Sequence, residues 1–516
     1  MKVLKLDRLN ESTRPTTAQA KKAEREKKKA EREKQKAERL RWKDVIDNWL
    51  PIEGSDLLKL ASDKSALNRM RTEGWETDRA KFPAGQDFPG LHNEEGRPTT
   101  AVLDCAESPV ELFLYFLPRE FWLGVERETN RYYDQELPAR MDSKFRSQTG
   151  SNVMTLDQIL ANEKRMHSRI RAHEILQCIG LLLARMMCPH IRRLSDHWAT
   201  TSIGAIPAGT FGRFMKRERF DRIMRNLHFS NNLSTDKAWK VRPIVDTLQR
   251  TFLSGYTTPP VLSFDEAMVP SRSRYNPMRQ FMKDKPHRWG TKLFMTCCAK
   301  SAYCLRLEVY CGKSSQDPAG DEDPSDDSSG PAATLRNMNA VLPRKEKGVY
   351  HAVVTDRFYT SIQIALQLLK RNVYSVGTIQ TRKRGFPTFL KQKESKRPKH
   401  VPRGCTQFAV SKSVPQLSTM VWFDNTIVYI PAATTYPRTK GDYTLSGCYE
   451  AYHQYMGGVD VHDQLRLQRY SVQLSLRFRK YYKSLALGLI DMAIINSFII
   501  FRENCKMRGD PPADHA

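Results

Sequence analysis

The sequence lacks the residue patterns that mark secreted, membrane-spanning or zinc-binding proteins. Its ten cysteines are scattered, with no Cys-x-x-Cys pair and no Cys/His cluster at zinc spacing, which argues against a disulfide framework and a zinc finger. No apolar signal core follows the basic N-terminus. The longest apolar run, residues 485–501, is interrupted by Asp491 and Asn496 and is too short for a membrane span. We therefore expect a protein of a reducing compartment, the nucleus or the cytosol, with no membrane partner.

Acidic residues are far fewer than basic ones. The chain has 57 Asp and Glu against 84 Lys and Arg, a formal net charge of +27 and a pI near 9.7. Such a field attracts a polyanion, which is nucleic acid or, as the weaker alternative, an acidic membrane surface. At 516 residues, with 40% hydrophobic residues, the chain is long and apolar enough for more than one globular domain.

A charged repeat marks the N-terminal region. Residues 22–26, 29–33 and 36–40 read KAERE, KAERE and KAERL, so only alanine recurs at a seam. A single alanine seam predicts a solvated charged helix rather than a coiled coil. The basic excess of this helix contacts phosphates, serves as a nuclear import signal, or is ordinary solvated surface.

Residues from about 105 to 255 show the 3.6-residue period of amphipathic helices. The segment 170–188 is apolar at helical spacing, and 214–229 places an apolar stripe on a second helix. The sequence therefore predicts a helical domain. The other face of the second helix is basic, which suits a nucleic-acid backbone and equally suits ordinary surface. The stripe comprises Phe220, Ile223, Met224 and Leu227, and the basic face comprises Lys216, Arg217, Arg219, Arg222 and Arg225.

An acid, Asp265, follows a short β-prone run and precedes a dense basic and aromatic segment. The run 261–264 predicts a buried strand, with Asp265 where that strand emerges and Pro270 closing the segment. An acid beside many cations indicates a place where metal and phosphate meet, although a lone acid also serves simply to balance local positive charge. The cations are Arg272, Arg274, Arg279, Lys283, Lys285, His287, Arg288 and Lys292.

Beyond Asp265 the hydrophobic period changes to two. Residues 291–299 and 303–311 predict a β-hairpin beside the Asp265 strand. The Asp-, Ser- and Pro-rich stretch 314–330 predicts a disordered surface insertion. The cysteines of the hairpin are expected to be reduced core residues, and they are Cys297, Cys298, Cys304 and Cys311.

A strand, a helix and a second strand are predicted after the insertion. Residues 349–355 form a β-branched run that ends at Asp356, and Ser361 then caps a helix over 362–369. A further strand begins over 373–379, so the two strands are expected to be parallel. Functional groups collect at the carboxyl ends of such strands, which makes Asp356 a second candidate acid.

Two more acids, Asp460 and Asp463, follow the pair Gly457 and Gly458. The acids are three residues apart and are expected on one face of a helix, which the glycines allow to start close to neighbouring backbone. Residues 420–430 predict a small β segment before it. Two basic loops, at 382–384 and 391–403, are expected to flank DNA. A basic segment precedes the apolar run 485–501 and contains Arg477, Arg479, Lys480 and Lys483.

Separated acids of this kind match the needs of two-metal phosphoryl transfer. Two Mg²⁺ ions about 4 Å apart activate the incoming oxygen and stabilise the leaving one, and carboxylates hold both ions. Without metal, clustered carboxylates raise one another's pKa. Any α/β protein of this size also has acids at strand ends, so their spacing alone leaves the function open.

Several motifs together resemble the piggyBac-like transposases, over about residues 170–502. The motifs stand in the same order as in that family, which chance seldom produces. They are FDRI at 220–223 with LHF at 227–229, RPIV at 242–245, DEAM at 265–268, KPHRWG at 285–290, DRFYTS at 356–361, MGGVD at 456–460 and DQ at 463–464.

The resemblance implies an α/β fold, an RNase H-like catalytic core with a β-rich insertion, flanked by an α-helical dimerisation and DNA-binding domain. It places a catalytic, metal-binding triad on Asp265, Asp356 and Asp460, with Mg²⁺ or Mn²⁺ as cofactor, and Asp463 as an additional required or supporting acid. Members of the family cut and paste DNA as dimers, with hairpin ends and TTAA targets. A nuclear, homodimeric transposase acting on double-stranded DNA, both transposon ends and target, is therefore expected. A transposon-derived DNA-binding protein without turnover is the alternative.

The resemblance also implies domain boundaries. Residues 1–80 are expected to be basic and largely disordered or a single helix, and 506–516 to be a tail. The other parts are a helical domain over 81–258 and 469–505, a catalytic core over 259–381 and 446–468 with an acidic disordered insert near 314–348, and an insertion domain over 382–445.

Residues expected to contact DNA surround the acids, and a few positions depart from the family pattern. Gln380 stands where many members have a basic residue, and Arg357 where many have Asn. Members commonly carry a cysteine-rich zinc domain at the C-terminus, whereas this sequence stops at Ala516 with only Cys505 nearby, so no zinc site is expected. The predicted DNA contacts are Lys285, His287, Arg288, Lys292, Arg382, Lys383, Arg384, Arg477, Arg479 and Lys480.

Overall fold

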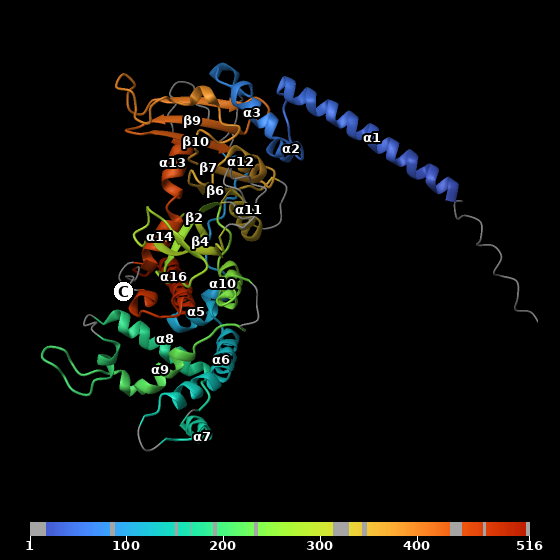
Figure 1. Cartoon of the computed structure of the whole chain (residues 1–516). Coiled ribbons are helices and arrows are strands. Elements are labelled where there is room, and N and C mark those ends of the chain that lie inside the picture. The colour runs from blue at the N-terminus through green and yellow to red at the C-terminus, as the bar shows by residue number, and fades with distance from the viewer. Residues whose placement is uncertain are drawn as a thin grey trace, which may run out of the picture.

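The molecule is elongated, and its sheet lies between an N-terminal helical segment and a lobe of helices (Figure 1). The computed structural model describes residues 17–511 apart from 83–87, 150–152, 167, 189–192, 232–235, 313–329, 343–347, 434–445 and 468–470. The predicted disordered insertion at 314–330 lies outside the described residues except for Gly330.

One mixed sheet of ten strands runs through the described part of the chain. Its order is β1-β8-β9-β10-β7-β6-β2-β4-β3, and β5 pairs with β4. The pairs β2–β6 and β6–β7 are parallel, and the other pairs are antiparallel. The strands are β1 Trp75–Glu76, β2 Val261–Pro270, β3 Arg279–Phe281, β4 Trp289–Cys298, β5 Cys304–Val309, β6 His351–Thr355, β7 Val373–Gly377, β8 Thr406–Ser411, β9 Leu417–Phe423 and β10 Ile427–Ala433.

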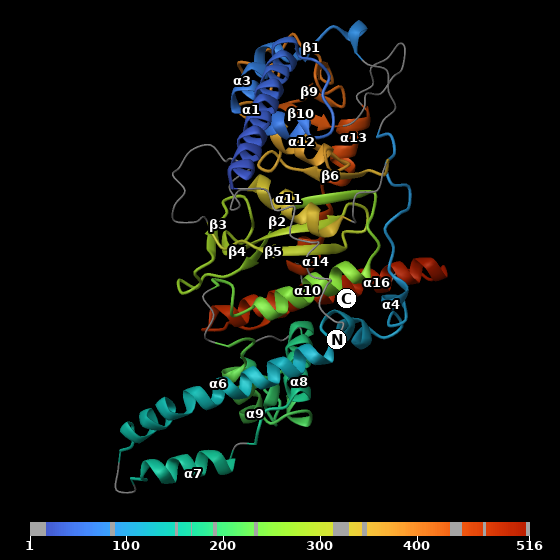
Figure 2. The ribbon, with the colours of Figure 1, turned by 90° about the vertical axis from the view of Figure 1, so that its right-hand side faces the viewer.

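Helices cover the sheet and form the lobe below it. Helix α10 packs on β5 and on α16, so these two helices lie between the sheet and the lobe (Figure 2). The helices are α1 Thr17–Asn48, α2 Asp56–Ser62, α3 Lys64–Glu73, α4 Thr100–Leu103, α5 Pro109–Phe116, α6 Arg119–Arg146, α7 Leu156–Met166, α8 Ala172–Met187, α9 Arg217–Asn226, α10 Arg242–Gly255, α11 Gly330–Val341, α12 Ile362–Leu369, α13 Ser446–Tyr455, α14 Gly458–Leu467, α15 Val472–Ser475 and α16 Tyr481–Arg508. Short 3-10 turns lie at Arg79–Lys81, Leu194–Trp198, Phe211–Arg213 and Thr388–Leu390.

Helix α16 is the centre of the larger hydrophobic core. Among the described residues it is the one helix long and apolar enough to cross a membrane by length and composition, and 78% of its apolar window is buried inside the fold. It packs against α5, α10, α15 and β2. The run 485–501 that the sequence marks as apolar therefore joins the lobe to the sheet.

The predicted strand, helix and strand around Asp356 are confirmed. Strands β6 and β7 are parallel, and the Ser361 hydroxyl accepts a hydrogen bond from the Ile364 amide at the start of α12. The predicted hairpin is confirmed as β4 and β5, whose turn places Ala302 at a φ of 64°. The helices predicted over 170–188 and 214–229 are confirmed as α8 and α9, and the apolar stripe of α9 is buried.

The structure differs from the sequence-based expectation in two regions. Residues 49–76 are neither disordered nor part of a single helix, because Trp49, Leu60 and other apolar residues pack on the sheet and β1 pairs with β8. Residues 330–341, expected within a disordered insert, form α11, which packs on β4, β5 and α12. The charged repeat and the acidic insert dominate the composition of these regions, and they hide short apolar segments that only tertiary contacts stabilise.

The predicted insertion continues the central sheet. The small β segment expected at 420–430 is two strands, β9 and β10, and β10 pairs with β7. That pairing is short, with only Ala432 opposite Val376 and Ala433 opposite Ser375. Strands β8–β10 therefore extend the sheet that holds the acids.

Candidate active site

Asp265 lies in the middle of a strand. The sequence-based prediction that it stands at the end of a strand is therefore wrong. Strand β2 continues to Pro270 because its other edge pairs with β4 along its whole length. Its parallel pairing with β6 ends at Phe264 opposite Thr355. Asp265 and Asp356 are therefore the next residues on adjacent strands, which brings the two carboxyl groups to the same place in the sheet.

Burial and mutual repulsion disfavour the charged forms of these two acids. Asp265 is 8% exposed, and burial raises its pKa well above the ordinary value, with further increases from the charges of Glu266 and Asp356. Burial also raises the pKa of Asp356, although the Phe358 amide donates a hydrogen bond to its Oδ1 at 2.8 Å. Two crowded carboxyl groups favour a compensating cation.

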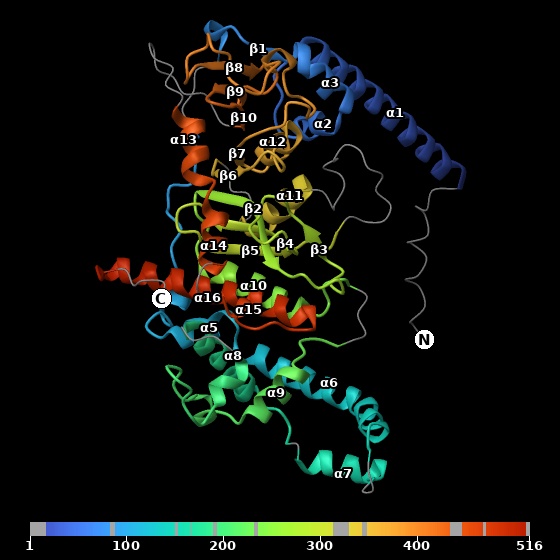
Figure 3. The same ribbon diagram turned by 60° about the vertical axis from the view of Figure 1, so that its left-hand side comes forward.

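Helix α14 packs on β2 (Figure 3), and its Asp460 lines the same cavity as Asp356. Gly458 permits the approach, since a Cβ there would lie 3.0 Å from both the Cys298 carbonyl oxygen and the Ser263 Cβ. The Ser263 hydroxyl also donates a hydrogen bond to the Met456 carbonyl at 2.8 Å. The predicted role of the glycine pair in close approach is confirmed at Gly458.

Lys285 connects the strand side and the helix side of the site. Its ammonium group donates to the Glu266 carbonyl oxygen at 3.0 Å and to Asp460 Oδ1 at 3.3 Å. Burial alone would lower its pKa, but Asp460 and Asp265 outweigh burial and raise it. Lys285 therefore remains a cation at neutral pH and neutralises part of the acidic charge.

Asp463 points its charge at Arg466. Arg466 is 1% exposed, and its Nε donates to Asp463 Oδ1 at 3.2 Å. The same guanidinium also donates to the Met268 carbonyl oxygen of β2. Of the roles open to Asp463 from the sequence, these contacts favour a supporting acid that fixes α14 to β2.

Glu266 is a fifth acid of the site, of intermediate burial, that the sequence did not single out. It accepts a hydrogen bond from the Tyr359 hydroxyl, and Lys292 Nζ lies 3.6 Å from its Oε2. Burial alone would raise its pKa, but Lys292 and Tyr359 outweigh burial and lower it. The sequence offered one signal for Glu266, which is that a charged residue stands within the apolar run 261–269.

Glu266, Asp356, Asp460 and Asp463 line one cavity of about 810 Å³ together with their cations, and Asp265 is not among its lining residues. Carboxylate oxygens are the donors that Mg²⁺ and Mn²⁺ prefer, so the donor chemistry fits such a metal. Within the described residues, however, no three Asp, Glu, His or Cys side chains converge on one point. The lining side chains include Glu266, Asp356, Asp460, Asp463, Lys283, Lys285, His287, Lys292, Arg357 and Gln380.

A second cavity, of about 1230 Å³, adjoins the first and shares Pro286 and His287 with it. We call it the basic groove. Exposed aromatic rings lie among its arginines, and Arg279 stacks over Trp289 with 4.4 Å between the guanidinium carbon and the ring centroid. Cations and exposed rings together suit a nucleic acid. The groove is lined by Arg272, Arg274, Tyr275, Phe281, His287, Arg288, Trp289, Arg477 and Arg479, among others.

The predicted DNA contacts lie at four places in the structure. Lys285 and Lys292 are held among the acids of the site, whereas His287, Arg288, Arg477 and Arg479 line the basic groove. Arg382 lines another cavity beside Arg357, with Lys383 and Arg384 next to it in the chain. Lys480 is exposed and donates a hydrogen bond to the Tyr132 hydroxyl.

A family model described as transposase IS4 matches residues 108–498, which run from the start of α5 into α16. The match covers more than half of the chain. The chain belongs to this transposase family. The chain is also similar to piggyBac proteins, which confirms the resemblance found in the sequence.

Two human relatives are identical to this chain at about a quarter of the aligned residues. The PiggyBac transposable element-derived protein 3 is 26% identical over 310 residues, 55% of this chain and 48% of the relative. The PiggyBac transposable element-derived protein 2 is 24% identical over 420 residues, 77% of this chain and 62% of the relative. The chain thus spans about half to three fifths of the length of these relatives.

A solved structure has the same fold. It is described as a cryo-EM structure of a piggyBac transposase synaptic complex with hairpin DNA, and it matches with a TM-score of 0.62, 22% identity, 82% of this chain and 80% of that chain. The mixed α/β fold expected from the sequence is thereby confirmed at the level of overall architecture.

Proposed function

We propose that this protein is a metal-dependent cut-and-paste DNA transposase that cleaves and transfers strands at transposon ends, with TTAA-type targets. The observation that carries the proposal is the shared position of three acids. Asp265 and Asp356 are neighbours on parallel strands, and α14 brings Asp460 to the cavity that Asp356 lines. The solved structure with hairpin DNA and the adjoining basic groove support DNA as the substrate.

Asp265, Asp356 and Asp460 would hold Mg²⁺ or Mn²⁺, which when bound activates the attacking oxygen and stabilises the leaving one. The chain's own residues do the remaining work. Burial keeps water from the Asp265 carboxyl group, and Glu266 and Lys292 hold Tyr359 and β2 in place. The arginines of the basic groove bind phosphates of the DNA.

The finer architecture belongs to the same proposal. Residues 259–381 and 446–468 would form an RNase H-like core, 382–445 its insertion, and 81–258 with 469–505 a helical dimerisation and DNA-binding domain. Support comes from the joining of β2, β6 and α14 around the acids, and from the packing of α16 against α5. A nuclear homodimer follows from the family resemblance.

Cleavage of the genomic sequence that flanks the coding region tests the proposal. A plasmid bearing both flanks would be incubated with the protein and Mg²⁺ or Mn²⁺, and release of the intervening fragment measured. Asp265→Ala, Asp356→Ala and Asp460→Ala should each abolish cleavage and leave DNA binding nearly intact, since acids bind cations and basic residues bind phosphate. Cleavage by any one variant removes that residue from the site, and unfolding of all three indicates a structural role.

A retired, transposon-derived DNA-binding protein is the second candidate function. The described residues contain no converged set of three metal donors, and Lys285 occupies one oxygen of Asp460. The human relatives are named as transposable element-derived proteins. DNA binding by the wild-type protein without metal-dependent cleavage would select this function.

A further inference from the structure

Three side chains outside the triad join the segments that carry Asp265 and Asp356. Glu266 directly follows Asp265 on β2. Tyr359 lies three residues after Asp356, in the turn before α12. The Tyr359 hydroxyl donates a hydrogen bond to Glu266 Oε2, and Lys292 Nζ of β4 lies 3.6 Å from the same oxygen. We call Glu266, Tyr359 and Lys292 the brace.

Each end of the brace is hydrogen-bonded to one of the two acids. The Glu266 amide donates to Asp265 Oδ1 at 2.8 Å. The Tyr359 amide donates to the Asp356 carbonyl oxygen at 3.2 Å and to Asp356 Oδ1 at 3.4 Å. The parallel pairing of β2 with β6 ends at Phe264, one residue before Asp265. The bond between Tyr359 and Glu266 therefore links the two segments just beyond the place where backbone pairing stops.

Packing fixes the brace in one arrangement. Tyr359 is 0% exposed, and the ring centroids of Phe264 and Phe294 lie 5.1 and 6.0 Å from its own, both edge-on. The Lys292 ammonium lies 5.1 Å from the centroid of Phe294 and 5.4 Å from that of Tyr359. Side chains that packing and hydrogen bonds lock in this way hold neighbouring groups precisely.

The contacts of Glu266 suit a support more than a metal ligand. Glu266 lines the same cavity as Asp356, but Tyr359 and Lys292 both engage its Oε2. Asp265 and Asp356, in contrast, lack such a cationic partner among their printed hydrogen bonds, which come from backbone amides. Mg²⁺ demands near-ideal geometry from its carboxylate ligands, so the separation of those two groups matters.

We propose that the brace positions the Asp265 and Asp356 carboxyl groups at the separation that one divalent cation requires. The inference rests on the proposed function, because it takes these two acids as metal ligands. Glu266, Tyr359 and Lys292 are positioning residues and do not touch the metal. Loss of such an outer partner typically weakens metal binding by about 10- to 100-fold.

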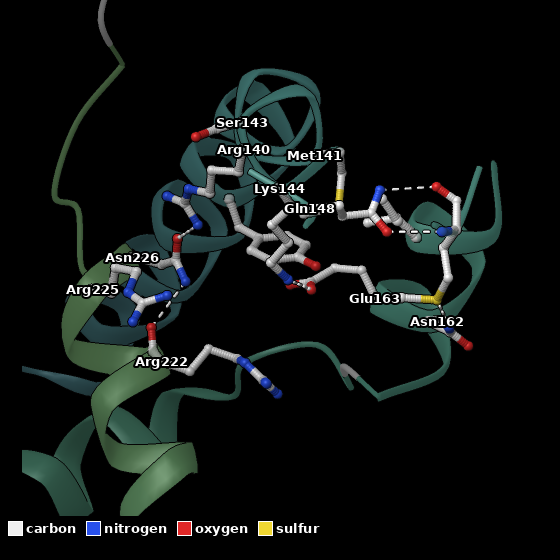
Figure 4. A pocket seen from close by; sticks show the side chains of 13 residues that line it. Arg140, Met141, Ser143, Lys144, Gln148, Asn162, Glu163, Arg222, Arg225 and Asn226 are labelled. Carbon is white, nitrogen blue, oxygen red and sulfur yellow. Dashed lines mark hydrogen bonds and ion pairs between the residues drawn. The ribbon is translucent and has the colours of Figure 1, made fainter. Parts of the chain in front are cut away.

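Two comparable groups elsewhere in the fold provide matched controls. Tyr303 is also 0% exposed, and its hydroxyl donates to the Phe252 carbonyl oxygen at 2.8 Å. Glu163 pairs with Lys144 at 2.5 Å in a pocket between α6, α7 and α9 (Figure 4). Neither Tyr303 nor Glu163 lines the cavity of the acids. Substituting them removes the same chemical groups without altering the brace.

Calorimetric titration of the full chain with Mn²⁺ tests the proposal. Tyr359→Phe keeps the packed ring and removes only the hydroxyl, so it should fold, and its Kd for Mn²⁺ should rise about 10- to 100-fold. Glu266→Ala should lose as much affinity. Glu266→Gln should regain most of it, because the amide oxygen still accepts the hydroxyl. Tyr303→Phe and Glu163→Ala should bind Mn²⁺ as the wild type does.

Denaturant unfolding in metal-free buffer accompanies the titration. Tyr303→Phe and Tyr359→Phe each remove one buried hydroxyl, so their losses of stability should be similar. A difference in Kd between these two variants then reports on the metal site and not on folding. An equal rise in Kd for both would attribute the effect to general destabilisation and overturn the positioning role.

Two further results overturn the positioning role alone. One is wild-type affinity in Tyr359→Phe while Asp265→Ala abolishes Mn²⁺ binding. The other is equal losses for Glu266→Gln and Glu266→Ala with none for Tyr359→Phe, which would make Glu266 a ligand. If the wild type binds no Mn²⁺, or if Asp265→Ala and Asp356→Ala bind it unchanged, the metal site of the proposed function fails, and the positioning role fails with it.

Discussion

Lys285 shows how a single side chain stabilises a cluster of acids. It is a partner of both β2 and α14, and it lies near enough to four acids for each to raise its pKa. Removing it would leave the negative charge of the cavity less compensated in the absence of metal. The role of Lys285 was not evident from the sequence, where it is one of eight basic residues spread over 272–292.

Lys285→Met should reduce the free energy of unfolding by about 1–3 kcal/mol, the contribution of hydrogen bonds to a charged group. Chemical denaturation in metal-free buffer measures it. Lys283→Met is the control, because Lys283 is exposed and lines the same cavity. Equal, small losses for both variants would contradict the connecting role of Lys285.

Asp463 and Asp460 provide a second comparison on one helix. Asp463→Ala leaves the buried Arg466 without its acid, and it should reduce the free energy of unfolding by about 3–5 kcal/mol. Asp460 is about half exposed, so Asp460→Ala should cost under about 1 kcal/mol. Thermal and denaturant unfolding of the two variants gives both values. A loss for Asp460→Ala that equals the loss for Asp463→Ala would show that the Asp463 pair is not a buried support.

The sequence pointed to Asp265, Asp356, Asp460 and Asp463 as candidates, but not to Glu266 or to how these acids are held. Asp356 and its capped helix follow from periodicity and local capping, which act within a few residues. Asp265 was placed at a strand end because its strand looked short, whereas pairing with β4 extends the strand to Pro270. Glu266, Lys292 and Tyr359 meet only through tertiary contacts, and no local pattern reports them.

At the scale of elements, a side chain of α16 caps the N-terminus of another helix. Asp491 accepts hydrogen bonds from the Val472 amide at 2.8 Å, from the Gln473 amide at 3.1 Å and from the Ser471 hydroxyl at 2.9 Å. These groups open α15, so the acid acts as a cap from a distant part of the chain. Burial nevertheless dominates and raises the pKa of Asp491 to about 6.

Asp491 gives a pH prediction. Its pKa is higher in the folded protein than in the unfolded chain, so the folded state binds its proton more tightly. Its titration therefore stabilises the fold most below about pH 4, and this contribution is lost as the pH rises through 6. Relative to Asp491→Asn, which does not titrate, the wild type should lose about 3 kcal/mol between pH 4 and 7.

Denaturant unfolding of both proteins across this pH range measures the difference. A difference in the free energy of unfolding between wild type and Asp491→Asn that stays constant with pH would contradict the raised pKa.

Elements such as α15 also show why helix boundaries are hard to predict from sequence. A four-residue helix has little propensity of its own, and its cap lies about twenty residues away.

For the whole molecule, the net charge of +27 is distributed over surfaces with different roles. The basic groove adjoins the acids, whereas the charged part of α1 projects away from the rest of the chain (Figure 1). Composition predicts binding to a polyanion, but only the fold distinguishes cations beside the site from cations on a solvated helix.

A salt titration separates these two surfaces. Arg272→Gln, Arg274→Gln, Arg477→Gln and Arg479→Gln together should weaken duplex binding and reduce the log K against log salt slope by about 3 to 4, since each phosphate contact contributes about 0.9. The matched control replaces four exposed lysines of α1, namely Lys27, Lys29, Lys34 and Lys36, by Gln. An equal reduction in the control would assign DNA contacts to α1 as well.

The pairing of β1 with β8 has a consequence for the order in which the chain is made. Trp75 lies opposite Ser411, so the first folded segment waits for more than 300 further residues to leave the ribosome. At about 5 to 20 residues per second, this delay is tens of seconds. Throughout it, Trp49, Leu60 and Trp75 lack most of their apolar neighbours. The N-terminal segment is therefore a natural client for chaperones during translation, and it docks among the last parts of the protein.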